Sequence, residues 1–278
     1  MLSRLRAATF KPPTPAAPPR QIYASYAAAL EGCGGYEEAD LLDVISAKTR
    51  VVRDEAAALE NAASESDIHS LLALMTCALE TRKPVLKVLD FGGACGAHYY
   101  SLRRLIPRPQ LQWVIVETPG MAERANGLVQ NGASLSAVAS VADAVRALDG
   151  TVDLVHASGA LQCTPDPFAA LAALLEVRAP VLLLTRGAVT TGTREIIVVH
   201  ESSLASNGPG PLPPQFQDRS VSYPFVFASR DRLLTQLRAV YRRILVLPDR
   251  TGHFPVNQEP VCGFAALCSE PCGRGKLQ

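Results

Sequence analysis

Beyond Pro84 the chain alternates short apolar runs typical of strands with segments of helical periodicity. Such alternation is typical of βαβ units, in which a parallel sheet carries helices on both faces. The predicted strands cover residues 85–90, 112–117, 134–139, 152–158, 181–186, 243–247 and 261–268. The predicted helices between them cover residues 97–105, 121–130, 141–148, 167–177 and 231–241. We therefore expect an α/β fold with a doubly wound, seven-stranded, mostly parallel sheet.

The residues before Pro84 have a different character. Residues 1–20 are proline-rich and basic without an acid, which predicts a disordered basic arm. Residues 21–82 predict a helical preface: a short helix within 22–30, an amphipathic helix over 36–60, and a third helix from Asp67, its predicted N-cap, to Leu79. Residues 83–278 then form the predicted Rossmann-like domain.

A long insertion, residues 187–224, interrupts this domain after the fifth predicted strand. It holds a strand-like run over 195–200 and a loop rich in glycine and proline over 206–214. Insertions of this length in a compact domain usually carry function or lack order. We expect it to close over the carboxyl ends of the strands, where ligands of doubly wound sheets bind.

Composition limits the partners. The 278 residues include 27 basic and 26 acidic side chains, so no excess charge points to nucleic acid. No run of eighteen apolar residues predicts a membrane span. Seven scattered cysteines without C-x-x-C spacing predict reduced thiols in a cytoplasmic protein and no metal site. The oligomeric state stays open.

The turn after the first predicted strand has the composition of a ligand-binding loop. Asp90 and Phe91 end the strand, and Gly92, Gly93 and Gly96 precede a helix. Glycines let the backbone approach a ligand, and a helix N-terminus offers free N–H groups.

A second acid, Glu117, ends the next predicted strand. A carboxylate at that place can accept hydrogen bonds from both hydroxyls of a ribose. The loop and this acid together predict a nucleoside-type ligand.

The glycine spacing narrows the choice of nucleoside. The dinucleotide pattern G-x-G-x-x-G would need glycine at position 91, which is Phe91, and no G-x-x-x-x-G-K-[ST] loop occurs. These facts argue against NAD and against ATP hydrolysis. An acid two residues before the first glycine suits S-adenosylmethionine better, and we expect Asp90 to organise the loop and to hydrogen-bond toward the amino-acid end of that cofactor.

The stretch from Val88 to Gly96 resembles motif I of class I S-adenosylmethionine-dependent methyltransferases, with Ala94 where a glycine is usual. More narrowly, the chain resembles a bacterial methyltransferase subfamily often encoded among surface-polysaccharide genes. The further matching stretches are Trp113-x-x-Val116-Glu117-x-Pro119, Ser158-Gly-x-Leu-Gln162, Pro165-Asp166-Pro167 and Ser222-Tyr223-Pro224. The sequence departs from that subfamily at Cys163, where an aromatic residue is common, and at Thr185-Arg186, where the subfamily tends to have Asp-Arg.

The resemblance implies a Rossmann-like methyltransferase fold and S-adenosyl-L-methionine as cofactor. By analogy with that fold, Phe91, Gly92, Gly93 and Gly96 would belong to the cofactor loop and Glu117 would bind the ribose. Residues Ser140 and Val141 would lie by the adenine, and the stretch from Ser158 to Gln162 would face the methyl donor. For Ser140 and Val141 a helix N-cap and a core valine are equally good interpretations.

Methyl transfer from a sulfonium depends mainly on positioning, and a base is needed only when the acceptor is a hydroxyl. His200 and Tyr223 are the candidate catalytic residues because both lie on the insertion. His98 and Glu201 are further candidates. His156, among apolar residues of a predicted strand, is expected to be a buried structural histidine.

Two functions follow from these patterns. The first is a methyltransferase that acts on a small molecule or on a sugar or glycan precursor. The alternative is a non-catalytic methyltransferase-fold protein that binds a nucleoside or acts as a scaffold in glycan assembly. The glycine spacing disfavours a third, a nicotinamide oxidoreductase.

Overall fold

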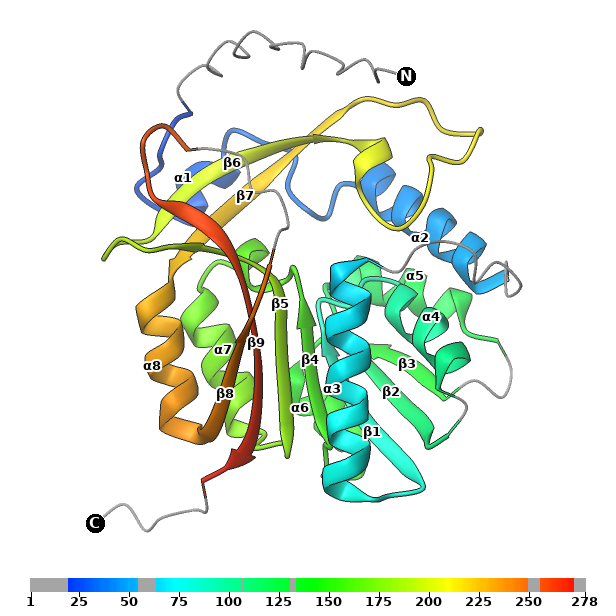
Figure 1. Ribbon diagram of the computed structural model, residues 1–278. Coiled ribbons are helices and arrows are strands. Elements are labelled where there is room, and N and C mark those ends of the chain that lie inside the picture. The colour runs from blue at the N-terminus through cyan, green and yellow to red at the C-terminus, as the bar shows by residue number, and fades with distance from the viewer. Residues whose placement is uncertain (1–19, 55–63, 107, 131–133, 250–255, 273–278) are drawn as a thin grey trace, which may run out of the picture.

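The computed structural model describes residues 20–54, 64–106, 108–130, 134–249 and 256–272. Within these ranges one nine-stranded sheet carries helices on both faces (Figure 1). The predicted arm, apart from Arg20, lies outside the described residues. No helix in the described ranges is both long enough and apolar enough to cross a bilayer.

Five parallel strands form the centre of the sheet, in the order β3-β2-β1-β4-β5. Their bounds are β1 Val85–Phe91, β2 Gln110–Val116, β3 Leu135–Val138, β4 Leu154–Ser158 and β5 Val181–Thr190. Strand β9 (Val261–Pro271) lies antiparallel beside β5, and β8 (Tyr241–Leu247) pairs with β9. The fold is α/β with a mostly parallel, Rossmann-like sheet, which confirms the predicted fold class.

The central strands form because both of their faces are covered. The start of β5 is a continuous buried run, as expected for a parallel strand between two helical layers. Along β1, Leu86 and Val88 join one hydrophobic cluster and Leu89 joins the other. The first layer contains α2 (Ala39–Asp54), α3 (Glu65–Thr81), α4 (Ala97–Leu105) and α5 (Pro119–Leu128). The second contains α6 (Val141–Ala147), α7 (Pro167–Glu176) and α8 (Arg230–Val240).

The start of α3 differs from the prediction. Its N-cap is Ser64, whose hydroxyl accepts a hydrogen bond from the Asp67 N–H at 3.1 Å, while the Asp67 carboxylate accepts one from the Ser64 N–H at 3.0 Å. The pair is a capping box, in which the acid stands three residues inside the helix. The prediction of Asp67 as the N-cap was therefore wrong by one helical turn.

Other boundaries also shift. The helix predicted over 36–60 begins at Ala39, and its predicted end lies outside the described residues. The short helix α1 (Tyr26–Leu30) begins only after Ser25, which caps it. Helix α5 begins at Pro119, since proline at the first helical position has its φ preset and needs no N–H partner.

The insertion forms a two-stranded ribbon, β6 (Ile196–Ser203) and β7 (Ser220–Ser229), with His200 opposite Tyr223. Strand β7 rejoins the sheet by pairing with β5 at Val189 and Thr190, so the predicted total of seven strands was two too low. Strand β7 was not predicted because it contains Pro224, and a proline within an apolar run argues against a strand. Figure 1 shows the ribbon across the end of the sheet where β4 terminates, and β7 contacts the short helix η1 (Leu161–Cys163) that follows β4.

The helical preface and the ribbon are fastened to each other. The buried Lys48 ammonium of α2 donates to the carbonyl oxygens of Ala205 and Asn207 at 2.6 and 2.7 Å. A second link lies just before α2, where the Gly35 N–H donates to the Ser222 carbonyl of β7 at 3.0 Å. Arg219 of the ribbon pairs with acids at the start of α2. The segment before the sheet therefore fixes the position of the insertion.

We expect Lys48→Met to lower the free energy of unfolding by about 2 kcal/mol, because two buried carbonyl groups would lose their donor. Urea unfolding monitored by circular dichroism measures this change. Arg50→Met, at an exposed position of the same helix, is the matched control and should change it by less than about 0.5 kcal/mol. Equal effects of the two substitutions would contradict the role of Lys48.

Candidate functional site

The glycine loop is built so tightly that two of its positions exclude side chains. A Cβ atom added at Gly92 would lie well inside 3.0 Å of the Ala160 side chain, and one added at Gly93 would come equally close to the Asp90 carboxylate. Gly92 also has a φ of 69° and extends the ladder by donating to the Val116 carbonyl at 2.9 Å. The loop therefore presents bare backbone above the end of β1.

Ala94 has a φ of 48°, in the left-handed region that glycine favours. The residue at the position where a methyltransferase usually has glycine thus has the conformation of a glycine. Its N–H donates to Glu117 Oε1 at 3.0 Å, which holds the loop against the end of β2.

The Glu117 carboxyl group lies at the junction of β2 and the loop. Its second oxygen, Oε2, accepts a hydrogen bond from the Thr118 N–H at 3.0 Å. A carboxylate oxygen can accept two hydrogen bonds, so each oxygen keeps capacity for a ligand hydroxyl. Burial raises the pKa of Glu117 to about 7, although both backbone donors oppose the rise.

Asp90 is placed differently from the prediction, which directed it toward the cofactor. Its side chain is fully buried: Oδ2 accepts from Trp113 Nε1 at 3.0 Å and Oδ1 contacts His156 Nδ1 at 2.7 Å. Burial alone would raise the pKa of Asp90, but the His156 ring and the Trp113 N–H lower it below its usual value. The carboxylate is thus directed into the protein, and it supports the loop from below.

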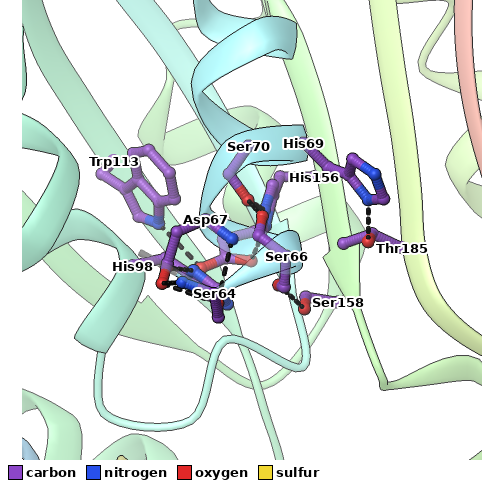
Figure 2. A network of polar contacts seen from close by, with 11 residues as sticks. Ser64, Ser66, Asp67, His69, Ser70, His98, Trp113, His156, Ser158 and Thr185 are labelled. Carbon is purple, nitrogen blue, oxygen red and sulfur yellow. Dashed lines mark hydrogen bonds and ion pairs between the residues drawn. The ribbon is translucent and has the colours of Figure 1, made fainter. Parts of the chain in front are cut away.

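A chain of polar contacts continues from Asp90 through His156 to α3. Figure 2 shows its members from His156 onward, with Ser70, Ser66 and Ser158. His156 Nε2 lies 2.8 Å from the Ser70 hydroxyl, and the Ser66 hydroxyl lies 3.1 Å from that of Ser158. Carboxylate, imidazole and hydroxyl follow one another as in a hydrolase triad. However, Asp90, His156 and Ser70 are all fully buried, so a substrate cannot reach the hydroxyl. His156 is the structural histidine that the sequence predicts.

The other predicted cofactor residues lie in two regions: the start of α6, and the segments that end β1 and follow β4. Ser140 is the N-cap of α6: its hydroxyl accepts from the Asp143 N–H at 3.1 Å, and Val141 packs partly buried against the second cluster. This arrangement matches the N-cap and core-valine interpretation. Phe91 also packs against that cluster. Gln162 is buried, and its amide donates to the Arg186 carbonyl at 3.0 Å.

The structure brings the candidate catalytic residues together. The rings of His200 and Tyr223 lie 5.3 Å apart between centroids, and Tyr36 contacts the same tyrosine edge-on at 5.3 Å. Burial raises the pKa of Tyr223 to about 12, and its hydroxyl donates to Asn207 Oδ1 at 3.4 Å. At neutral pH this phenol is protonated, so it can donate a hydrogen bond but not accept a proton.

Two residues of this region were missed by sequence reasoning: Tyr36, from the preface, and Arg186, from β5. The chain on either side of Tyr36 only indicates the start of a helix. For Arg186 the available signal was the Thr185-Arg186 pair, which stands where the subfamily tends to have Asp-Arg. Burial raises the pKa of Tyr36 well above its usual value, and the charge of Arg186 opposes part of that rise.

In the described part of the chain, no group of three or more His, Cys, Asp or Glu side chains could hold a metal ion. All seven cysteines are free. Burial raises the pKa of Cys163, beside the site, to about 12, so it stays a neutral thiol.

Comparison with known proteins gives only distant likenesses. No protein-family model and no curated protein matches the sequence. Among solved structures, the SAH-bound N-terminal domain of EvdMO1 is 19% identical, with 74% of this chain and 82% of that chain covered and a TM-score of 0.47.

Two further structures are similar at the same level. They are SAM-bound CalS10, an amino pentose methyltransferase from Micromonospora echinaspora (14% identity, 78% and 96% covered, TM-score 0.43), and DesVI of Streptomyces venezuelae (14%, 84% and 98%, TM-score 0.44). These values are too low to carry an argument about function, which rests on the geometry of the site itself.

The loop geometry predicts opposite outcomes for two neighbouring substitutions. Gly93→Ala should lower the free energy of unfolding by about 2 kcal/mol or more, because its methyl group would overlap the Asp90 carboxylate. Ala94→Gly should change it by less than about 1 kcal/mol, since relief at positive φ offsets the added chain entropy. Chemical unfolding of both variants measures the difference. A Gly93→Ala protein as stable as the Ala94→Gly protein would contradict the packing described.

Proposed function

We propose that this protein is an S-adenosylmethionine-dependent methyltransferase acting on a small molecule or on a sugar or glycan precursor. The observation that carries the proposal is the hydrogen bond between Glu117 and the Ala94 N–H. It joins a carboxylate with capacity for ribose hydroxyls to a bare glycine loop above β1. Phe91 at the position of the first dinucleotide glycine favours this cofactor over NAD.

The hydrogen-bonding groups around the loop suit S-adenosylmethionine. Glu117 would accept hydrogen bonds from the ribose, and the backbone from Gly92 to Gly96 would lie against the amino-acid end. The turn from Ser158 to Gln162 would line the methyl side, and Ser140 with Val141 would lie toward the adenine. Asp90 would act through the loop that it supports. The bound sulfonium supplies a methyl group for in-line displacement.

The remaining residues position the acceptor and exclude water. The ribbon brings His200 and Tyr223 to the carboxyl ends of the strands, and Tyr36 packs on Tyr223 from the preface. A base is required only for a hydroxyl acceptor. His200 is our candidate for that role, since the pKa of Tyr223, about 12, leaves its phenol as a hydrogen-bond donor.

The glycan-precursor acceptor is supported by the sequence resemblance, and the balanced charge disfavours a nucleic acid. The proposal includes a cytoplasmic location, supported by seven free cysteines, which persist in reducing compartments.

A non-catalytic, nucleoside-binding role would use the same loop, which has Ala94 where the methyltransferase motif usually has glycine. Methyl transfer separates the two functions. Radiolabel moving from S-adenosylmethionine to any acceptor in a small-molecule or sugar-nucleotide pool would reject the non-catalytic role. Binding of the cofactor without any transfer would reject the enzymatic one.

Calorimetric titration with S-adenosylhomocysteine tests the cofactor assignment. Glu117→Gln should weaken binding at least tenfold, because an amide removes the charge from two hydrogen bonds to the ribose. Glu123→Gln, at an exposed position of α5, is the matched control and should leave the affinity unchanged. No binding to the unaltered protein, or equal binding by both variants, would reject the assignment.

A further inference from the structure

Arg186 lies in a β-bulge in the middle of β5, one residue beyond Thr185, the last residue of β5 that pairs with β4. The pairing of β5 with β9 changes register between Leu184 and Gly187, so Thr185 and Arg186 together take the place of one paired residue. Arg186 has a φ of 53°, which costs a non-glycine residue roughly 1–2 kcal/mol. A bulge re-aims the side chain it carries, and such backbone strain is a reason to look for a function.

Three neighbouring elements hold this strained backbone in place. The Thr185 hydroxyl lies 2.8 Å from His69 Nδ1 of α3, and the Thr185 carbonyl accepts from the Gly159 N–H at 2.9 Å. The Arg186 carbonyl accepts from Gln162 Nε2 at 3.0 Å. Strained residues persist only where their surroundings over-determine them, as they do here.

The guanidinium that this bulge presents pairs with no acid among the residues that the structure describes. Arg186 is exposed, and its Cζ atom lies beside Gly159, 3.6 Å from where a Cβ atom of that residue would be. In the described ranges no acid forms an ion pair with its guanidinium, and no hydrogen bond of that group is found, whereas Arg219 and Arg232 both pair with acids. A strained backbone thus holds a cation, unpaired among the described residues, beside the turn that follows β4.

Three groups around this cation, Tyr36, Tyr223 and Cys163, are neutral at pH 7, whereas Glu117, whose charge also acts on Tyr36 and Cys163, has a pKa that burial raises to about 7. Burial raises the pKa of Tyr223 and of Cys163 to about 12 and that of Tyr36 well above its usual value, and the Arg186 charge opposes part of each rise. The same three groups come from the ribbon, from η1 and from the preface. An anion at Arg186 would therefore meet hydroxyl and thiol groups and one planar cation, which suits bidentate binding of phosphate or carboxylate.

The position of β5 points to the acceptor rather than the cofactor. The proposed cofactor residues follow β1, β2, β3 and β4, and β5 lies beyond β4, two strands from β1. Leu184 of β5 is level with Ala157 of β4 and with Phe91, the last residue of β1. With strands 4.7–4.9 Å apart, this part of β5 is about 10 Å from the end of β1. The methyl side of the proposed site, after β4, lies between the glycine loop and Arg186.

We propose that Arg186 binds an anionic group, a phosphate or a carboxylate, of the methyl acceptor. The inference rests on the proposed methyltransferase function and adds a substrate class to it. Such an acceptor would place its anionic end at Arg186, beside the packed pair Tyr36 and Tyr223.

The test titrates protein saturated with S-adenosylhomocysteine with inorganic pyrophosphate and, separately, with malonate, at constant ionic strength. Arg186→Gln should weaken the binding of at least one probe tenfold or more while leaving the S-adenosylhomocysteine affinity within about twofold. Arg186→Lys should bind more weakly than the unaltered protein, since it loses the planar fork. The probe that binds better distinguishes a phosphate from a carboxylate acceptor.

Two further variants keep the result interpretable. Arg186→Gly suits the positive φ, so it should fold at least as stably as the unaltered protein and lose the probes as well. Arg238→Gln, exposed in the last turn of α8, is the control and should bind the probes normally.

The outcomes separate the two proposals. Failure of both probes to bind, or binding of both unchanged in Arg186→Gln, would overturn the anion site. A tenfold loss of S-adenosylhomocysteine affinity in Arg186→Gln would assign Arg186 to the cofactor carboxylate and also overturn it. No S-adenosylhomocysteine binding by the unaltered protein would instead reject the methyltransferase function, and the probes would then be titrated without it.

Discussion

The buried carboxylate of Asp90 is the interaction on which the site depends. It joins β1 to β2 through Trp113 and to β4 through His156, and Ser70 extends the contact to α3. A buried charge is tolerated only when it is paired and hydrogen-bonded, and removal of one partner from such a pair typically costs 3–5 kcal/mol. The ends of three strands and one helix are therefore fixed relative to one another just below the glycine loop.

The geometry of the loop follows from this constraint. Gly93 must lack a side chain because the Asp90 carboxylate occupies the space that a Cβ atom would need. The turn then passes through the left-handed conformation of Ala94 and offers its N–H to Glu117. Segments remote in sequence complete the site: the preface contributes Tyr36 and the ribbon contributes Tyr223. Lys48, buried between preface and ribbon, keeps these two segments together.

Local patterns were sufficient to predict much of the fold. The alternation after Pro84 predicted the sheet, and α4 has the predicted bounds because Gly96 marks its start. The role of Asp90 could not be predicted, since its partners His156 and Trp113 are 66 and 23 residues away and meet it only once β4 and β2 flank β1. Asp67 was predicted as the N-cap because an acid suits both the N-cap position and the third helical position of a capping box. Likewise, the bulge at Arg186 arises from pairing with β9, about eighty residues later.

The central claim is that Glu117 binds the ribose of the cofactor, and proton release measures it most directly. The pKa of Glu117 is raised by burial from 4.5 to about 7, so at pH 6.5 most of this carboxyl group is protonated in the free protein. Ribose hydroxyls that donate to the carboxylate favour its charged form and lower that pKa. Titration with S-adenosylhomocysteine at pH 6.5, in two buffers of different ionisation enthalpy, should therefore show the release of most of one proton. The release should vanish in Glu117→Gln and at pH 9, where the carboxyl group is already ionised. Binding enthalpies that agree between the two buffers, or proton release that persists in Glu117→Gln, would contradict the account.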